Sequence, residues 1–409
     1  MPDFWREVPP TAGLPLRWRD FLPHANSGSL EARLADFLNV PAVQIECSGT
    51  AALIIALTTL KRASNRRSVI IPAYTCPLVA LAVIHCGLQP VLCDLQPNSF
   101  DFSAEALRKA CSSDTLAIIP THLGGRVADL TIVSDLAQSC GAWVIEDAAQ
   151  ALAATNRGQS VGTLGDLGFY SLAAGKGLTL YEGGVLVARD AALRQALRET
   201  SAQIAPYRVL WEMRRLAQFV GYAALYRPET LRLAYGIPLR RALKRGELIK
   251  AVGDDFSSAI PLHRAGAIRR AVGANAALRL PAFLEVLSAQ AISRKKQLET
   301  ISGVTVIGDS DASRGLWPFL MVLMATERAR DAALARLWTA GLGVSRLFIH
   351  ALPDYPYLAK RLGSADVTNA RDFAARMLTI SNSPWLRDRD FAMILSTLAD
   401  VSSAVSQQR

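Results

Sequence analysis

The feature that most constrains this chain is the alternation of short apolar segments with helical patterns in its first 200 residues. The strand-like segments are rich in β-branched residues and span 68–74, 89–95, 115–123, 142–148 and 183–190. The helix-like segments among them are 50–62, 76–87 and 103–113. Strands that are apolar on both faces and alternate with helices indicate a parallel sheet covered on both sides. We therefore expect residues 1–200 to form a large α/β domain with a mostly parallel sheet.

The pattern changes after residue 200. Residues 201–262 read as basic, amphipathic helices interrupted near Pro228 and Pro238, and we interpret them as an insert or linker. Residues 263–409 are expected to form a smaller α+β domain. Its expected helices span 278–301, 329–341 and 388–405, and its expected strands span 317–324 and 344–349.

Composition excludes several classes of protein. Hydrophobic residues make up 51% of the chain and charged residues 20%, which argues against disorder. No apolar run reaches the length of about 18 residues that predicts a transmembrane helix. The N-terminus lacks a signal-peptide pattern, so we expect a cytoplasmic protein. The six cysteines include no Cys-x-x-Cys pair, which favours buried reduced thiols over zinc or disulfides.

The positive charge is concentrated in one segment. Residues 205–250 carry ten arginines and lysines against three glutamates, a net +7 of the +10 total. This segment could lie on an anionic membrane surface, since Trp211, Phe219, Tyr222 and Tyr226 are interleaved with the charges. It could also be a dimer-interface or lid element whose arginines bind a nucleotide diphosphate or face solvent. No nucleic-acid-binding motif accompanies it, so we expect no nucleic-acid partner.

Small and polar residues stand where predicted strands end, which is where open α/β sheets bind ligands. Gly49 and Thr50 precede an apolar helix and could either cap it or hold a phosphate. Asp147 follows an apolar strand, where it could bind a metal or a ribose, pair with a protonated ring nitrogen, or cap the next helix. No nearby ligand spacing supports a metal site, so none is predicted.

Two further residues could carry chemistry. Lys176 lies between two glycines, five residues after Ser171. A lysine in such a place can be desolvated, which lowers its pKa and makes it a nucleophile toward aldehydes. The alternative is a lysine on a tight surface turn. His122 also follows a predicted strand, although a lone histidine is more often structural than catalytic.

These motifs, taken in order, resemble the DegT/DnrJ/EryC1/StrS family of sugar aminotransferases, which depend on pyridoxal 5′-phosphate (PLP). The resemblance is dense over residues 45–190, patchy over 263–360 and absent over 201–262. It implies a fold type I PLP enzyme with its active site at a homodimer interface. The matching motifs are SGTAAL, VIIPAYT, QPVLCDL, AIIPTHLGGRVADL, VIEDAAQA, VGTLGDLGFYSLAAGKGLTLYEGG and GLGVSRLFIHALPDYPYL.

The resemblance also implies roles for single residues. Lys176 matches the lysine that forms a Schiff base with PLP and moves the proton, and Asp147 matches the carboxylate that pairs with the pyridine nitrogen. The residues implied to bind the cofactor are Gly49, Thr50 and Ser171 at the phosphate, Gln150 near the ring, and Asn275 from a partner subunit. His350 matches a histidine near the substrate, and His122 is assigned to the same side.

The sequence departs from the family pattern at three places, one of which is the LAAG stretch between Ser171 and Lys176, where the family has an aromatic residue and a short polar stretch on the substrate side. The aromatic residue that usually stacks on the cofactor ring is replaced by Cys76, and Tyr74, the nearest aromatic, is taken as a substitute contact. The Arg-Met pair that usually follows the asparagine reads Ala277–Leu278.

The resemblance implies ping-pong transamination from an amino acid, expected to be glutamate, to a keto sugar, expected to be nucleotide-linked. The product would serve polysaccharide, glycan or natural-product biosynthesis. Some relatives have histidine in place of the lysine and catalyse deoxygenation, and Lys176 argues against that branch. The alternative is a PLP-fold protein without turnover that acts as a scaffold or regulator. Retention of Lys176, Asp147 and Ser171 together argues against this alternative.

Overall fold

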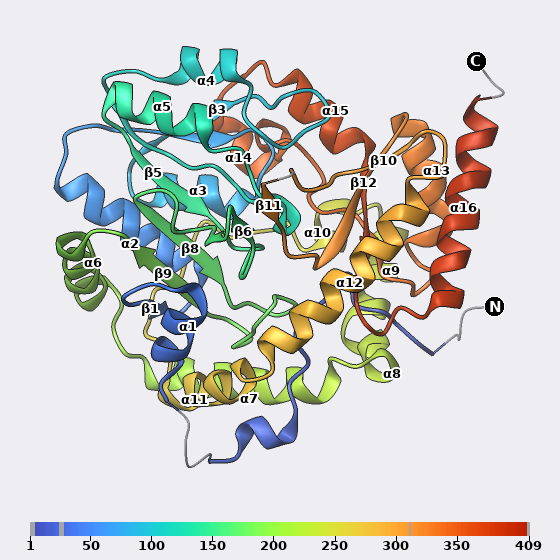
Figure 1. The fold of residues 1–409 in the computed structure, drawn as a ribbon, viewed down its shortest axis with the longest axis horizontal. Helices are drawn as coiled ribbons and strands as arrows, with labels where there is room; N and C mark the ends of the chain where they lie inside the picture. The colour runs from blue at the N-terminus through green and yellow to red at the C-terminus, as the bar shows by residue number, and fades with distance from the viewer. Residues whose placement is uncertain (1–4, 24–27, 311, 407–409) are drawn as a thin grey trace.

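A computed structural model describes residues 5–23, 28–310 and 312–406. Its N-terminal half is organised by a seven-stranded sheet in the order β1-β9-β8-β5-β4-β2-β3 (Figure 1). The strands are β1 (Gln44–Glu46), β2 (Ser68–Pro72), β3 (Gln89–Cys93), β4 (Thr115–Ile118), β5 (Trp143–Asp147), β8 (Leu167–Ser171) and β9 (Gly184–Ala188). Strands β3, β2, β4, β5 and β8 are parallel, and β9 is antiparallel to its neighbours β8 and β1. The expectation of a mostly parallel sheet is confirmed.

Both faces of this sheet are covered by helices, as the doubly apolar strands require. Val69 and Ile71 of β2 pack with α2 (Gly49–Arg62) and α3 (Pro77–His85), whereas Ile70 packs on the opposite side. There it meets α4 (Ala104–Ala110) and α5 (Thr131–Cys140). Helices α1 (Leu30–Leu38) and α6 (Ala191–Ile204) complete the covering near β9. Two of the six cysteines, Cys47 and Cys93, are buried, and the other four are partly exposed.

The C-terminal half forms a smaller antiparallel sheet in the order β10-β12-β14-β13 (Figure 1). Its strands are β10 (Val304–Val306), β12 (Phe319–Met324), β13 (Val344–Ser345) and β14 (Met377–Ser381). Its helices are α12 (Leu280–Leu298), α13 (Glu327–Leu337), α14 (Pro356–Leu362), α15 (Thr368–Arg376) and α16 (Asp388–Ser406). The expected strand over 344–349 ends at Ser345. The chain leaves the sheet there, and the Arg346 side chain donates to the carbonyls of Ile349 and Ala374.

Short elements join the two halves. Strand β11 (Ser313–Arg314) pairs with β6 (Thr155–Asn156), which pairs with β7 (Gln159–Ser160). The N-terminal segment also bridges the halves, since Ala12 N–H donates to Pro318 O and Leu14 N–H donates to Gly177 O.

The basic insert is helical. It contains α7 (Val209–Leu225), α8 (Pro228–Leu231), a π-helical turn η3 (Arg232–Gly236), α9 (Ile237–Lys244) and α10 (Leu248–Val252). The interruption expected near Pro228 is present, because α7 ends before that proline. Near Pro238 the break in the α-helix is η3: this π-helical turn precedes the proline and runs directly into α9, which carries Pro238 in its first turn. No helix in the described ranges is both long and apolar enough to cross a membrane.

A buried ion pair fastens α7 to α11 (Ala267–Ala277). Arg269 Nη2 lies 2.6 Å from Glu212 Oε2, and its Nε lies 2.7 Å from Oε1. The arginine side chain is fully buried, and its Nη1 also donates to the carbonyl of Leu180 at 3.1 Å. This pair therefore fixes the insert against the loop that precedes β9.

Replacing Arg269 with methionine should strongly destabilise the protein, because Glu212 would keep a buried charge without its partner. We expect Arg269→Met to lower the free energy of unfolding by about 3–5 kcal/mol in chemical denaturation. The double variant Arg269→Met/Glu212→Leu removes both charges and should recover most of that loss. A single variant as stable as the wild type would contradict this assignment.

Candidate active site

A cavity of 990 Å³ opens at the carboxyl edge of the large sheet, between the two halves of the chain. Its walls include seven of the residues singled out from the sequence: Gly49, Thr50, His122, Asp147, Gln150, Ser171 and Lys176. The insert supplies another wall through residues 252–261 and through Arg215 of α7. The C-terminal half contributes Leu347 and Phe348. The structure thus brings most of the predicted site residues into one cavity.

One end of the cavity is built to hold an anion. Ser48 caps α2, since its Oγ accepts from Ala51 N–H at 3.0 Å and its carbonyl accepts from Ala52 N–H at 3.0 Å. The amides of Gly49 and Thr50 lie before the first intrahelical acceptor, so the positive end of the helix is available to a ligand. A Cβ on Gly49 would lie 3.3 Å from Ser171 Cβ, which explains the glycine at this close approach. Ser48 is therefore the residue that caps α2, and Thr50 lines the cavity.

Asp147 ends β5 with a buried carboxylate that faces the same cavity. Its Oδ1 accepts from Ala149 N–H at 3.0 Å. Burial raises the pKa of Asp147 to about 6, and the Ala149 amide and the positive charge of Lys176 oppose that rise. A cationic group placed beside this carboxylate would therefore be strongly attracted to it.

Lys176 sits in the loop between β8 and β9, tightly packed from behind. A Cβ on Gly13 would lie 2.8 Å from Lys176 O, and a Cβ on Gly175, at φ +75°, would lie 2.5 Å from Thr11 Oγ1. The N-terminal segment thus packs closely against the loop that carries Lys176. Burial lowers the pKa of Lys176, partly offset by Cys76 and Asp147. A lysine with a lowered pKa is more often neutral and nucleophilic, and Lys176 lines the cavity, which favours the nucleophile over a lysine on a surface turn.

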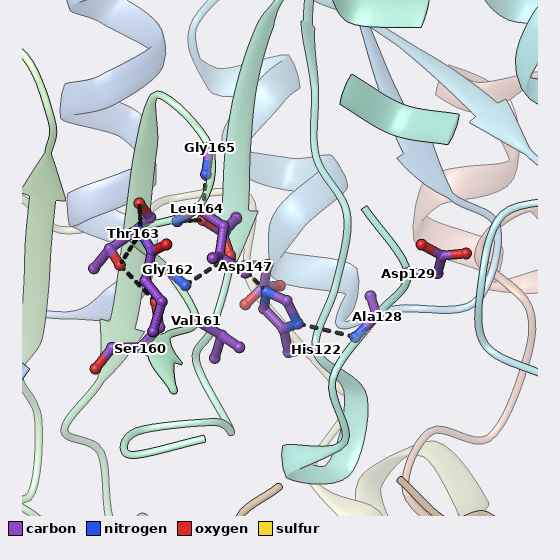
Figure 2. A network of polar contacts seen from close by, with 12 residues as sticks. His122, Ala128, Asp129, Asp147, Ser160, Val161, Gly162, Thr163, Leu164 and Gly165 are labelled. Carbon is purple, nitrogen blue, oxygen red and sulfur yellow. Dashed lines mark hydrogen bonds and ion pairs between the residues drawn. The ribbon is translucent and has the colours of Figure 1, made fainter. Parts of the chain in front are cut away.

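His122 is fully buried, and both of its ring nitrogens are engaged (Figure 2). Nδ1 accepts from Ala128 N–H at 3.0 Å, so the ring proton is on Nε2, which donates to Glu146 Oε2 at 2.9 Å. The Glu146 carboxylate also accepts from the amides of Gly162, Leu164 and Gly165. His122 is thereby fixed in one orientation, and a role toward substrate stays a prediction.

Three predicted residues lie outside the cavity walls. Tyr74 is buried among Phe348 and Phe373, and its hydroxyl donates to Phe348 O at 3.1 Å. This corrects its interpretation as a cofactor contact, because its ring is held in the core while Cys76 lines the cavity. The ring of His350 packs against Tyr355 instead of lining the cavity. Asn275 donates to the carbonyls of Asp20 and Leu22, and its role through a partner subunit stays a prediction.

Several cavity residues were missed by the sequence analysis. Asp254, at the end of the insert, accepts from Tyr355 Oη at 2.5 Å and from Ile349 N–H at 3.0 Å. Burial raises the pKa of Asp254 to about 6. Glu182 and Arg215 form an ion pair in the wall. Only Glu182 carried a signal, as part of the Glu-Gly-Gly motif after Lys176.

Comparison with known proteins places this site in context. Residues 22–214 match the model of the DegT/DnrJ/EryC1/StrS aminotransferase family. The chain is 39% identical over 172 residues to the UDP-N-acetyl-3-dehydro-alpha-D-glucosamine 3-aminotransferase of Acidithiobacillus ferrooxidans, covering 42% of this chain and 46% of that protein. It is 26% identical to the spore coat polysaccharide biosynthesis protein SpsC of Bacillus subtilis over 380 residues, covering 91% and 88%. The chain spans about a third to a half of the length of the first curated relatives that it matches.

A solved structure supports the fold over the whole chain. Spr1654 from Streptococcus pneumoniae, in its PLP form, aligns with a TM-score of 0.76 and 19% identity. The alignment covers 98% of this chain and 99% of that chain. At this level of identity the likeness establishes the fold, which is the fold type I architecture expected from the sequence.

Asparagine at position 147 should change how the stability of the cofactor-free protein depends on pH. The folded-state pKa of Asp147, about 6, lies above its ordinary value of 3.8, so the stabilisation by its protonated form is complete below about pH 4 and is lost as the pH rises through 6. Asp147→Asn should match the wild type near pH 4 and exceed its stability at pH 7 by about 3 kcal/mol. Thermal unfolding from pH 4 to 8 would measure this. A difference independent of pH would contradict the buried charge.

Proposed function

We propose that this protein is a PLP-dependent sugar aminotransferase of the DegT/DnrJ/EryC1/StrS family, whose model matches residues 22–214. The observation that carries the proposal is one cavity in which Lys176 and Asp147 lie beside the anion-binding end of α2. An amine, a carboxylate and an anion cradle are the groups that a pyridoxal phosphate requires. The family match alone would not place them together.

The residues of the cavity fit PLP. The amides of Gly49 and Thr50, with the hydroxyls of Thr50 and Ser171, would hold its phosphate. Asp147 would hold the protonated pyridine nitrogen, since its buried carboxylate faces the cavity and would be stabilised by a cation there. The volume of 990 Å³ leaves space for a sugar as well as the cofactor. When bound, PLP supplies an electron sink for a carbanion at the substrate.

The chain's own groups perform the proton chemistry in this proposal. Lys176 Nζ, whose pKa is lowered by burial, is the amine that would hold the cofactor aldehyde. Once free, the same Nζ would take the α-proton of the amino donor and deliver it to the former aldehyde carbon, which lies two bonds away across the nitrogen. Asp147 would keep the ring nitrogen protonated throughout. The insert residues Phe256 and Ile260 would limit the access of water to this proton transfer.

The proposal extends to the amino donor, the sugar acceptor and the oligomeric state. We propose glutamate as the donor and a nucleotide-linked keto sugar as the acceptor, in polysaccharide, glycan or natural-product biosynthesis. The names of the Acidithiobacillus ferrooxidans and Bacillus subtilis relatives support a nucleotide-linked sugar and a polysaccharide pathway. We also propose a homodimer in which Asn275 serves the partner's cavity, which a mass measurement in solution would test.

Loss of the Lys176 amine should abolish the half-reaction. Wild-type protein loaded with PLP should show a visible absorption band that bleaches on addition of glutamate. We expect Lys176→Ala to show neither that band nor the bleaching, because it has no amine for the aldehyde. Lys109→Ala, on exposed α4, is the matched control and should behave as the wild type. If wild-type protein shows no band, the scaffold or regulator alternative replaces the enzyme.

We also propose a peripheral membrane contact through the outer side of α7. Exposed apolar residues gather there, with Leu210 83% and Met213 62% exposed. Arg208 and Arg214 are exposed next to them, and Arg227 is exposed just beyond the far end of the helix. An apolar strip flanked by arginines suits an anionic bilayer. A second copy of this face would bring like charges together, so charge complementarity favours lipid over self-association.

Acidic substitutions on this strip should abolish vesicle binding. We expect the wild type to sediment with vesicles that contain phosphatidylserine and not with vesicles of phosphatidylcholine alone. Leu210→Glu/Met213→Glu should lose this binding, because it removes apolar contact and adds repulsion. Ile292→Glu, at a 52% exposed position of α12, is the control and should bind normally. No wild-type binding at low salt would contradict the membrane contact.

A further inference from the structure

Arg215 is a cation in the cavity wall that the proposed chemistry does not yet use. Among the described residues that line the cavity, the lysines and arginines are Lys176 and Arg215. Arg215 comes from α7 of the insert, immediately after the segment that matches the family model ends at residue 214. Its presence in the cavity is therefore a property of this chain's insert.

The register of three strands brings Arg215 to the anion cradle. Gly184, the first residue of β9, pairs with Ser171 of β8 on one side and with Glu46 of β1 on the other. A Cβ on Gly184 would lie 2.2 Å from Ser48 O and 2.7 Å from Gly49 N, so this strand start touches the N-terminus of α2. Glu182 lies two residues before this strand start and lines the same cavity. Its ion pair with Arg215 holds the guanidinium in the cavity wall on the side of this strand start.

The guanidinium is held from behind by contacts within α7. Nη1 donates to Gln218 Oε1 at 2.8 Å, and the guanidinium carbon lies 4.9 Å from the centre of the Trp211 ring. The Arg269–Glu212 ion pair fixes the same turn of the helix. Glu182 engages Nε and Gln218 engages Nη1, and a guanidinium carries further N–H donors. The side chain is thus oriented in advance, with donors left for an anion in the cavity.

The cradle needs such a cation. Its other donors, the Gly49 and Thr50 amides and the Thr50 and Ser171 hydroxyls, carry no formal charge. A phosphate monoester carries a charge of about −2 at neutral pH, and a buried charge is costly unless it is paired. A planar guanidinium is well suited to phosphate because it can donate two parallel hydrogen bonds.

We propose that Arg215 binds the phosphate group of the cofactor from within the same subunit, with Glu182 as the residue that positions it. This inference rests on the proposed function, since it assumes that the cavity holds PLP. It adds a charged contact that the family-matched residues do not supply. It is also separable from Asn275, whose proposed contact is to the partner's site.

Comparing PLP with pyridoxal, which lacks the phosphate, tests this assignment directly. We would titrate each ligand into the cofactor-free protein and follow the visible absorption band. Arg215→Gln should weaken PLP binding about tenfold or more, the loss typical of a charge-assisted hydrogen bond, and should leave pyridoxal binding within about twofold. Arg241→Gln is the matched control, because it removes the same charge from an exposed position of α9 in the same insert. It should change neither affinity.

The other outcomes show whether Arg215 binds the phosphate, the carboxylate of the amino donor or neither. Equal losses of PLP and pyridoxal binding in Arg215→Gln, or no loss of either, would overturn the proposal. Unchanged PLP binding together with a higher glutamate concentration for bleaching would assign Arg215 to the donor carboxylate instead and would also overturn it. A wild type that binds neither ligand would contradict the proposed function itself. If Arg215→Gln does not fold, Arg215→Lys keeps the charge without the planar fork and should lose part of the PLP preference; an unchanged preference would overturn the proposal.

Discussion

The burial of Lys176 and Asp147 in one cavity is the constraint on which the rest of the structure depends. Burial disfavours the charge of each group, so the pKa of the lysine is lowered and that of the aspartate is raised. A neutral amine and a carboxylate that gains from a cation are the two properties that aldehyde chemistry on a pyridine ring demands. Both result from exclusion of water, which no local sequence motif provides by itself.

The surrounding elements maintain that exclusion. The N-terminal segment packs behind the Lys176 loop through Thr11 and Gly13, and the insert closes the opposite wall through residues 252–261. The Asp254–Tyr355 hydrogen bond joins the insert to the C-terminal half at 2.5 Å. Segments far apart in the chain therefore build the walls of one cavity. The insert has two sides in this arrangement, an inner one with Arg215 in the cavity and an outer one with Leu210 in solvent.

The parts of the fold that were predictable share a physical cause. Strands β2, β4 and β5 were recognisable because burial on both faces leaves a continuous apolar run. Strands β8 and β14 were not expected, because LGFYS and MLTIS are short and merge with neighbouring loop or helix patterns. Tyr74 was misassigned for a different reason: one residue along a strand end separates a core position from a cavity position. Thr75, the next residue, lines the cavity together with Cys76, whereas Tyr74 packs on Phe348 and Phe373.

By itself, the sequence determined that strands β2, β4 and β5 alternate with helices, and hence the sheet edge at which Asp147 lies, while Gly49, Ser171 and Lys176 were assigned there by the family resemblance. This is possible because parallel strands all end at the same edge, so residues that follow successive strands converge without further information. Only the tertiary structure decided that Arg215, Glu182 and Asp254 join them, and that Glu146 holds His122. Those contacts depend on how the insert packs and on strand register, which arise from interactions between distant segments and leave no periodic pattern in the chain.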